Sequence, residues 1–277
     1  MTAAEALRAA IARLRAGGIE DAALDARCLL AHALGLTPDR LTLHLPDEMS
    51  APQARAFDRA VAARLARQPV AQIIGQRQFW GLGFRVTRDT LDPRPETETL
   101  VAEALRLPFR KVLDLGTGTG CILLSCLHDC PTAEGLGVDI SAAALEVARG
   151  NARALGLEGR ASFQLSDWFS TVAGRFDLIV SNPPYIAADE MAGLAPEVRD
   201  WEPQIALTPG GDGLSPYRIL GRDAPARLEP GGRLIVEIGP TQGRAVQALF
   251  AVAGLEDVRI LPDLDGRDRV VVARQPA

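Results

Sequence analysis

The stretch Phe176–Tyr185 constrains the fold more than any other, because it joins a predicted strand to a loop at a fixed residue. Its first half is a short apolar run with β-branched residues, which predicts a buried strand. Pro183 and Pro184 lack the N–H groups that a strand ladder needs, so the chain must leave the sheet at Asn182. An open α/β sheet binds its ligands just beyond the carboxyl ends of its strands, which is where Asn182 and Tyr185 are expected.

The groups in this loop suit a planar amino group. Asn182 has both an acceptor and a donor on its amide, Pro183 keeps a free backbone carbonyl, and Tyr185 supplies a flat ring for stacking. Together they can hold a planar NH2. The tripeptide Asn-Pro-Pro alone fits an ordinary loop after a core strand equally well, so the interpretation depends on the rest of the chain.

A glycine-rich turn follows a second predicted strand, Lys111–Leu115. Residues 116–120 read Gly-Thr-Gly-Thr-Gly, a turn that lets a ligand approach the backbone closely before a helix begins at Cys121. A dinucleotide fingerprint needs glycine at its sixth place, where this chain has Cys121, and a phosphate-binding P-loop needs Gly-Lys-Ser/Thr, which is absent. Both pyrophosphate-binding interpretations are therefore disfavoured.

Two further predicted strands end beside acidic residues. The strand Gly135–Val138 is followed by Asp139, whose carboxylate can accept hydrogen bonds from both hydroxyls of a ribose. The strand Ala161–Leu165 leads to Asp167, which can hold an exocyclic amine, and to Trp168, which can pack on a purine. Each acidic residue alone fits an ordinary turn, but three successive strand ends of this kind favour a nucleoside without a diphosphate.

The first 90 residues predict a different kind of structure. A capping box at Thr2 begins one amphipathic helix, and two more are expected from Asp21 to Leu34 and from Ser50 towards Arg67. Residues 70–90 carry aromatic and β-branched pieces separated by glycine, which predicts a β-hairpin linker. Nothing in the helical part carries chemistry, so a recognition or lid module is the simplest interpretation.

These motifs, in this order, resemble the S-adenosylmethionine-dependent methyltransferases that act on planar nitrogens. Further segments narrow the resemblance to the HemK/PrmC family, the release-factor glutamine methyltransferases, and it covers essentially the whole chain. The segments that carry it are Pro93–Glu98, Glu197-Val198, Glu202-Pro203, Gly211–Leu214 and Glu237–Gly239. Two residues depart from the family pattern outside the catalytic loop: Asp92, where an apolar residue is expected, and Trp201, where Tyr or Phe is more usual.

The resemblance implies a Rossmann-like α/β fold with a seven-stranded sheet whose last strand is antiparallel, preceded by a small all-helical domain and a β-hairpin linker. The expected divisions are residues 1–70 for substrate recognition, 71–92 for the linker and 93–277 for the methyltransferase domain. The C-terminal pattern agrees, because the turn Asp263–Gly266 can join only antiparallel neighbours. The elements expected there are a long loop to Asp212, helices 215–228 and 242–253, and strands 233–238, 257–261 and 269–273.

The resemblance also implies an activity. A methyl group passes from S-adenosyl-L-methionine, which becomes S-adenosyl-L-homocysteine, to the side-chain amide nitrogen N5 of the glutamine in the Gly-Gly-Gln motif of class 1 peptide chain release factors. The catalytic residues are then Asn182, Pro183 and Tyr185, and these with Pro184 bind the substrate. The expected cofactor-binding residues are Gly116, Thr117, Gly118, Thr119, Gly120, Asp139, Asp167, Trp168 and Asn182. No metal is expected, and Arg94 and Glu96 receive no role.

Composition bears on where the protein acts and on which other functions remain possible. No stretch approaches 18 apolar residues, so we expect a cytoplasmic protein that does not enter a membrane. We also expect a monomer. A nucleic-acid amino methyltransferase, acting on adenine N6 or guanine N2, could use the same loop, but a net charge of −5 disfavours direct nucleic-acid binding. Cys121 disfavours an NAD-type oxidoreductase. A non-enzymatic adaptor would be expected to lose Gly118, Asp139 or Asn182, and all three are present.

Overall fold

The computed structural model describes all 277 residues, which form two compact units. The helical unit comprises Met1–Gln76 together with Ala195–Trp201. The sheet unit comprises Arg77–Leu194 and Glu202–Ala277. The chain therefore leaves the sheet unit once, between Leu194 and Glu202, before completing it.

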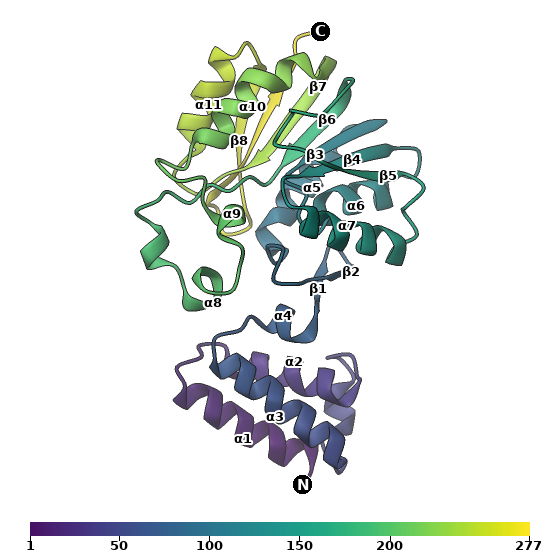
Figure 1. The fold of residues 1–277 in the computed structure, drawn as a ribbon, viewed down its shortest axis with the longest axis vertical. Helices are drawn as coiled ribbons and strands as arrows, with labels where there is room; N and C mark the ends of the chain where they lie inside the picture. The colour runs from purple at the N-terminus through teal and green to yellow at the C-terminus, as the bar shows by residue number, and fades with distance from the viewer. The chain divides into compact units, whose positions relative to one another are not determined.

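The helical unit is built from short amphipathic helices around their own apolar core (Figure 1). Capping boxes begin two of them, with the Thr2 hydroxyl accepting from the Glu5 N–H and the Ser50 hydroxyl from the Gln53 N–H. The first of these pairs was predicted as a capping box. The helices are α1 (Ala3–Ala16), α2 (Ala22–Leu34), the 3-10 helix η1 (Leu41–His44), α3 (Ala51–Leu65) and α4 (Val70–Ile74).

Helix α4 corrects the predicted start of the linker, since Val70–Ile74 is helical rather than part of a hairpin. Ile73 and Ile74 are β-branched, but they pack against the core of the helical unit, and Gly75 ends the turn in the left-handed conformation. The hairpin itself is present and shorter than residues 71–92. Its strands are β1 (Gln76–Phe79) and β2 (Leu82–Arg85), joined at Trp80 and Gly81 with φ of +53° and +70°, values typical of a type I′ turn.

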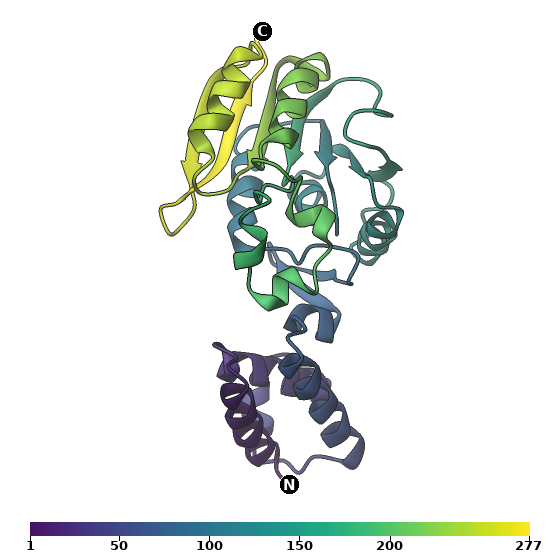
Figure 2. The ribbon, with the colours of Figure 1, turned by 60° about the vertical axis from the view of Figure 1, so that its left-hand side comes forward.

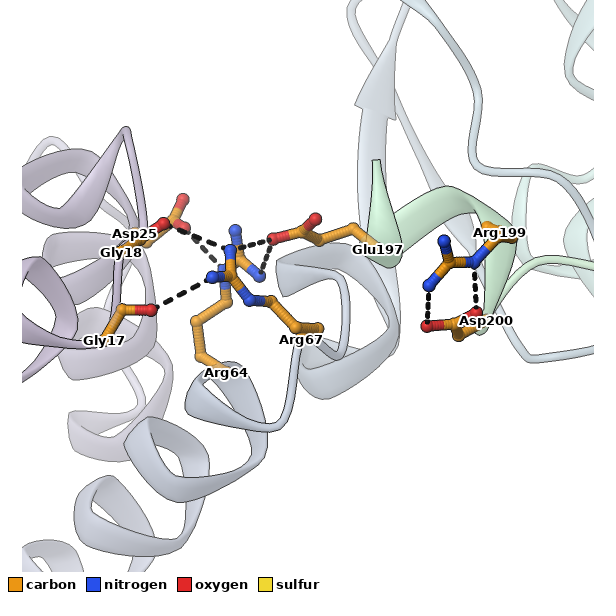
Figure 3. A network of polar contacts seen from close by, with 8 residues as sticks. All are labelled: Gly17, Gly18, Asp25, Arg64, Arg67, Glu197, Arg199 and Asp200. Atoms are coloured by element: carbon orange, nitrogen blue, oxygen red, sulfur yellow. Dashed lines mark hydrogen bonds and ion pairs between the residues drawn. The ribbon is translucent and has the colours of Figure 1, made fainter. Parts of the chain in front are cut away.

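The segment Ala195–Trp201 belongs to the helical unit although it is distant in sequence. Its short helix α8 (Pro196–Arg199) carries Glu197, which accepts hydrogen bonds from Arg64 at 2.9 Å and from Arg67 at 3.2 Å (Figure 3). Arg64 also donates to Asp25 at 2.6 Å. A mostly buried ion-pair network thus fastens the segment to helices α2 and α3.

The sheet unit contains a seven-stranded sheet in the order β5-β4-β3-β6-β7-β9-β8 (Figures 1 and 2). The first five strands in this order are parallel, and β9 runs antiparallel to both of its neighbours. This confirms the predicted fold class, with the last strand of the chain reversed. The strands are β3 (Lys111–Leu115), β4 (Glu134–Asp139), β5 (Ala161–Leu165), β6 (Phe176–Ser181), β7 (Leu228–Glu237), β8 (Glu256–Pro262) and β9 (Asp268–Arg274).

Helices cover both faces of the sheet, as in other parallel sheets (Figure 1). On one face lie η2 (Pro95–Thr97), α5 (Glu98–Leu105), α6 (Cys121–Asp129) and α7 (Ala142–Ala154). On the other lie α10 (Ser215–Asp223), η4 (Ala224–Ala226) and α11 (Gly243–Val252). The strands between them alternate side chains into two apolar cores, so that Val112 and Leu178 join one core while Leu113 and Ile179 join the other.

The predicted helix 215–228 is too long at its end. The helix stops at Asp223, a 3-10 turn follows, and Leu228 already begins β7. Pro225, within that turn, cannot donate in a continuing helix. The predicted long loop after Asn182 also contains short helical turns, namely η3 (Met191–Gly193), α8 and α9 (Gln204–Leu207). None of the helices is long and apolar enough to cross a membrane.

Candidate active site

A cavity of about 340 Å³ opens at the carboxyl ends of β3, β4, β5 and β6, where an α/β sheet binds its ligands. Most of the predicted site residues line it. They are Gly116, Thr117, Gly118, Thr119, Asp139, Asp167, Trp168, Asn182 and Pro184. Gly120, Pro183 and Tyr185 lie outside its lining. The structure therefore brings together residues from four strand ends that the sequence could place only one at a time.

The glycine-rich loop is held to the neighbouring strand. The N–H groups of Gly116 and Thr117 both donate to the carbonyl oxygen of Val138, and the Gly118 N–H donates to Asp139 Oδ2 at 2.9 Å. Gly118 has φ of +54°, a left-handed conformation that glycine adopts without strain. The loop thus presents its backbone to the cavity and is locked against the end of β4.

Asp139 is a nearly buried carboxylate in a polar setting. Its Oδ2 accepts from Gly118 and its Oδ1 from the Ser141 N–H at 2.9 Å, at the start of α7. Burial raises the pKa of Asp139, and these two N–H groups oppose that rise. Each oxygen keeps a lone pair, so the carboxylate can still accept bonds from vicinal hydroxyls of a ligand.

Asp167 and Trp168 form the far wall of the cavity, after β5. Asp167 is exposed, and its N–H donates to Ser170 Oγ at 3.2 Å. Trp168 is half-buried and has φ of +50°, which is unusual for an aromatic residue. The Ser166 hydroxyl donates to the Trp168 carbonyl at 2.7 Å and stabilises this turn.

Asn182 lies in the cavity wall directly after β6, as its place in the sequence predicted. Its Nδ2 donates to Thr97 Oγ1 at 3.3 Å, and Thr97 Oγ1 donates to Glu237 Oε2 at 2.6 Å. Burial raises the pKa of Glu237 to about 7, although the Thr97 bond acts in the opposite direction. Sequence reasoning missed both partners, and the only signal available was that Thr97 and Glu237 fall within segments that carried the resemblance.

The backbone of Tyr185 is held by residues from outside the loop. Its carbonyl oxygen accepts from Gln242 Nε2 at 2.9 Å, and a Cβ on Gly213 would overlap that same oxygen. Burial and the nearby Glu237 raise the pKa of the Tyr185 phenol to about 12. Gly213 is therefore required by close approach to the loop, and the phenol stays neutral at physiological pH.

A second set of charged residues, to which sequence reasoning gave no role, lies at the cavity. Arg94 lines it and donates to both oxygens of Glu202 at 2.7 Å. Burial raises the pKa of Glu202 to about 7, while Arg94 lowers it and Asp92 raises it. Asp92, one of the two departures from the family pattern, is buried in the cavity wall, and burial raises its pKa against the opposing charge of Arg94. No group of three or more His, Cys, Asp or Glu side chains is placed to hold a metal ion.

Comparison with known proteins gives a consistent result along the whole chain. A family model described as PrmC N-terminal domain matches residues 5–75, and one described as Methyltransferase small domain matches residues 88–198. A release factor glutamine methyltransferase of Cereibacter sphaeroides is 64% identical over 277 residues, covering 100% of both chains. Another, of Rhodospirillum rubrum, is 48% identical and covers 96% of this chain and 82% of its own.

Among solved structures, a methyltransferase from Pyrococcus furiosus is similar with a TM-score of 0.56 at 16% sequence identity. The match covers 80% of this chain and 100% of that one. At this identity the likeness concerns the fold alone.

Proposed function

This chain belongs to the release factor glutamine methyltransferase family, and from that premise we propose that it methylates the glutamine of the Gly-Gly-Gln motif in class 1 peptide chain release factors. The methyl group goes from S-adenosyl-L-methionine to the side-chain amide nitrogen N5. The observation that carries the proposal is the 64% identity with a protein of that name over the full length of both chains.

The cavity fits this cofactor by its shape and its donor set. Its volume of about 340 Å³ lies within the usual range for small-molecule sites. Asp139 offers free lone pairs to a ribose, and Ile122, Ile140 and Trp168 offer apolar surface to a purine. Ile140 is 52% exposed although it is apolar, as expected of a residue that a ligand covers.

The main task of the protein in this reaction is to orient the glutamine amide towards the methyl donor. When bound, the cofactor supplies a methyl group on a positively charged sulfur, which is already a strong electrophile. A carboxamide nitrogen is a poor nucleophile, because its lone pair is delocalised into the carbonyl. In our proposal the Asn182 amide oxygen and the Pro183 carbonyl accept the two N–H bonds of the glutamine, and Tyr185 stacks on the amide plane. Such alignment can lower a barrier by roughly 7–11 kcal/mol in favourable intramolecular systems.

The proposed substrate also indicates how the partner is bound and where the protein acts. A class 1 release factor presents its Gly-Gly-Gln motif in an exposed, glycine-flexible loop, so one glutamine side chain can enter the cavity. Residues 1–70 carry no catalytic motif, and in our proposal they provide a second contact surface for this folded partner. We expect the enzyme to act as a cytoplasmic monomer.

The test is methyl transfer to purified release factor. The protein is incubated with S-adenosyl-L-methionine and either wild-type release factor or a variant whose Gly-Gly-Gln glutamine is replaced by alanine. Tryptic peptides are then read by mass spectrometry. We expect one methyl group on the wild-type loop and none on the variant. Equal labelling of both, or transfer to DNA or RNA in a parallel incubation, would reject the assignment.

A further inference from the structure

The amide of Asn182 can serve the proposed reaction in one orientation only. Its oxygen must face the glutamine NH2, because the opposite orientation would set two N–H donors against each other. Nothing in the Asn-Pro-Pro-Tyr sequence itself determines which end of the amide faces the cavity. The side chains that contact the Asn182 amide must therefore decide it.

Two buried side chains from other elements form a chain of contacts with Asn182: Thr97, which also lines the cavity, and beyond it Glu237, which does not. Thr97 ends η2 and is 2% exposed, and Glu237 ends β7 and is 1% exposed. Strands β6 and β7 are parallel neighbours in which Ser181 pairs with Val236, so Asn182 and Glu237 emerge side by side. Thr97 lies between their side chains.

The hydrogen atoms in this chain of contacts can be assigned from chemistry. Thr97 Oγ1 lies 2.6 Å from Glu237 Oε2, a distance typical of a hydroxyl that donates to a carboxylate. Threonine has one hydroxyl proton, and while Glu237 is ionised that proton is committed to its carboxylate. Towards Asn182 the hydroxyl oxygen therefore presents only lone pairs, and it accepts from Asn182 Nδ2 at 3.3 Å. The opposite rotamer of the amide would place two acceptors together.

We propose that Thr97 and Glu237 are positioning residues that fix the Asn182 amide with its nitrogen towards Thr97 and its oxygen towards the substrate. This inference rests on the proposed function, since it concerns the same amide-binding group. Through Thr97, the Pro-Glu-Thr segment before α5 thus influences the chemical step by positioning Asn182, without touching the reacting atoms. The backbone carbonyl of Glu237 accepts from the Tyr217 hydroxyl at 2.9 Å, which holds the end of β7 in place.

The kinetic test compares hydroxyl-bearing and hydroxyl-free side chains of similar shape. Thr97→Val should lower kcat for release factor about tenfold or more, with the dissociation constant for S-adenosyl-L-methionine changed less than about twofold. Thr97→Ser should recover most of the lost turnover. Glu237→Gln should resemble Thr97→Val, because a glutamine amide donating to Thr97 frees the hydroxyl proton for the Asn182 oxygen. The control is Ser125→Ala. This change removes a buried hydroxyl that has no hydrogen-bond partner and that lies outside the cavity lining.

A double-mutant cycle separates positioning from a general loss of packing. In an Asn182→Ala background, Thr97→Val should lower the residual kcat by less than about twofold, because the group that Thr97 orients is gone. Full additivity of the two losses would show that Thr97 acts independently of Asn182 and would overturn the inference. Wild-type kcat in both Thr97→Val and Glu237→Gln would overturn it as well.

A spectroscopic test does not depend on activity. The chain has two asparagines, Asn151 and Asn182, so selective 15N labelling gives two side-chain amide pairs. Thr97→Val and Glu237→Gln should shift the Asn182 pair. They should leave unmoved the Asn151 pair, whose amide bonds the carbonyls of Arg85 and Thr119. An unmoved Asn182 pair in both variants would reject the positioning role. If the wild-type protein fails to methylate release factor, the proposed function fails, but this measurement still tests whether Thr97 and Glu237 contact the Asn182 amide.

Discussion

Asp139 and Asp167 lie at the ends of adjacent strands and line one cavity. Their surroundings differ, so they should contribute unequally to ligand affinity. Asp139 is held by two backbone N–H groups and lies largely out of water, whereas the Asp167 side chain is exposed. A hydrogen bond from a ligand to a charged group strengthens as water is excluded. The first strand-end carboxylate should therefore contribute more to ligand affinity than the second.

Asp139→Ala should weaken S-adenosyl-L-methionine binding by at least about tenfold, because it removes charge-assisted bonds worth roughly 1.5–3 kcal/mol and leaves the Gly118 and Ser141 donors unpaired. Asp167→Ala, the matched comparison, should cost less. Titration calorimetry of both variants checks the order. Unchanged affinity in Asp139→Ala would remove the ribose-binding role, and a larger loss in Asp167→Ala would reverse the ranking.

Asp114 gives a prediction for pH. It is fully buried, and burial raises its pKa to about 7 despite the bond from the Thr117 hydroxyl. The same carboxyl in the unfolded chain has a pKa near 4. Its contribution to stability is therefore fully present below about pH 4 and is lost as the pH rises through about 7. An asparagine side chain cannot ionise, so the Asp114→Asn variant does not lose this stability as the pH rises. The free energy of unfolding of the variant minus that of the wild type should therefore increase between pH 5 and pH 8. Urea denaturation of the ligand-free protein measures the difference, and parallel pH curves would contradict it.

At the scale of elements, one glycine within helix α7 and one just after it differ in backbone conformation. Gly150 lies within the helix, and Gly156 follows its end with φ of +68°. A Cβ added at either position meets no atom within 4 Å, so crowding does not distinguish them. The backbone alone separates the two sites.

Gly150→Ala should raise the free energy of unfolding by about 0.5–1 kcal/mol, since alanine is the better helix former. Gly156→Ala should lower it by about 1–2 kcal/mol, because the left-handed conformation is strained for alanine. Denaturant midpoints at a constant slope measure both changes. The same sign in both variants would show that local backbone preference does not control α7.

Several elements were predictable because their signals are local. The strands Lys111–Leu115 and Ala161–Leu165 have the predicted bounds, since apolar runs between turn residues mark a buried strand from within. Helix α4 was missed because Ile73 and Ile74 have strand-like preferences that packing overrides. The bond of Asn182 to Thr97 joins residues 85 positions apart. No pattern in one sequence reports such a pairing, so the strand ends of the site were predictable and the residues behind them were not.

At the scale of the whole molecule, the loop between Asn182 and α10 serves both units. Its part Ala195–Trp201 packs within the helical unit, and Glu202 directly after it belongs to the sheet unit, where it binds Arg94. The backbone thus continues directly from the segment to Glu202, the partner of Arg94, which lines the cavity. The domain division predicted at residue 70 did not include this segment.

Glu197 holds the segment Ala195–Trp201 to the rest of the helical unit through Arg64 and Arg67. Its side chain is 20% exposed and meets Arg64, which is 11% exposed. Burial raises the pKa of Glu197, but the hydrogen bonds to its carboxylate, including those from Arg64 and Arg67, outweigh burial and lower it overall. Within the same segment, Arg199 and Asp200 pair with each other at 43% and 50% exposure, so water screens that ion pair and it should contribute little to stability (Figure 3).

Glu197→Gln should therefore loosen residues 195–201, while Asp200→Asn should not. We expect amide exchange in this segment to accelerate about tenfold or more in the first variant, because a charged partner of two arginines is lost. If the helical unit and this segment together recognise the release factor, KM for that substrate should rise, with the affinity for S-adenosyl-L-methionine unchanged. Hydrogen exchange by mass spectrometry and steady-state kinetics measure the two effects separately. Faster exchange with an unchanged KM would mean that the segment moves without affecting recognition, and equal exchange in both variants would mean that the Arg64 and Arg67 pairs do not hold it.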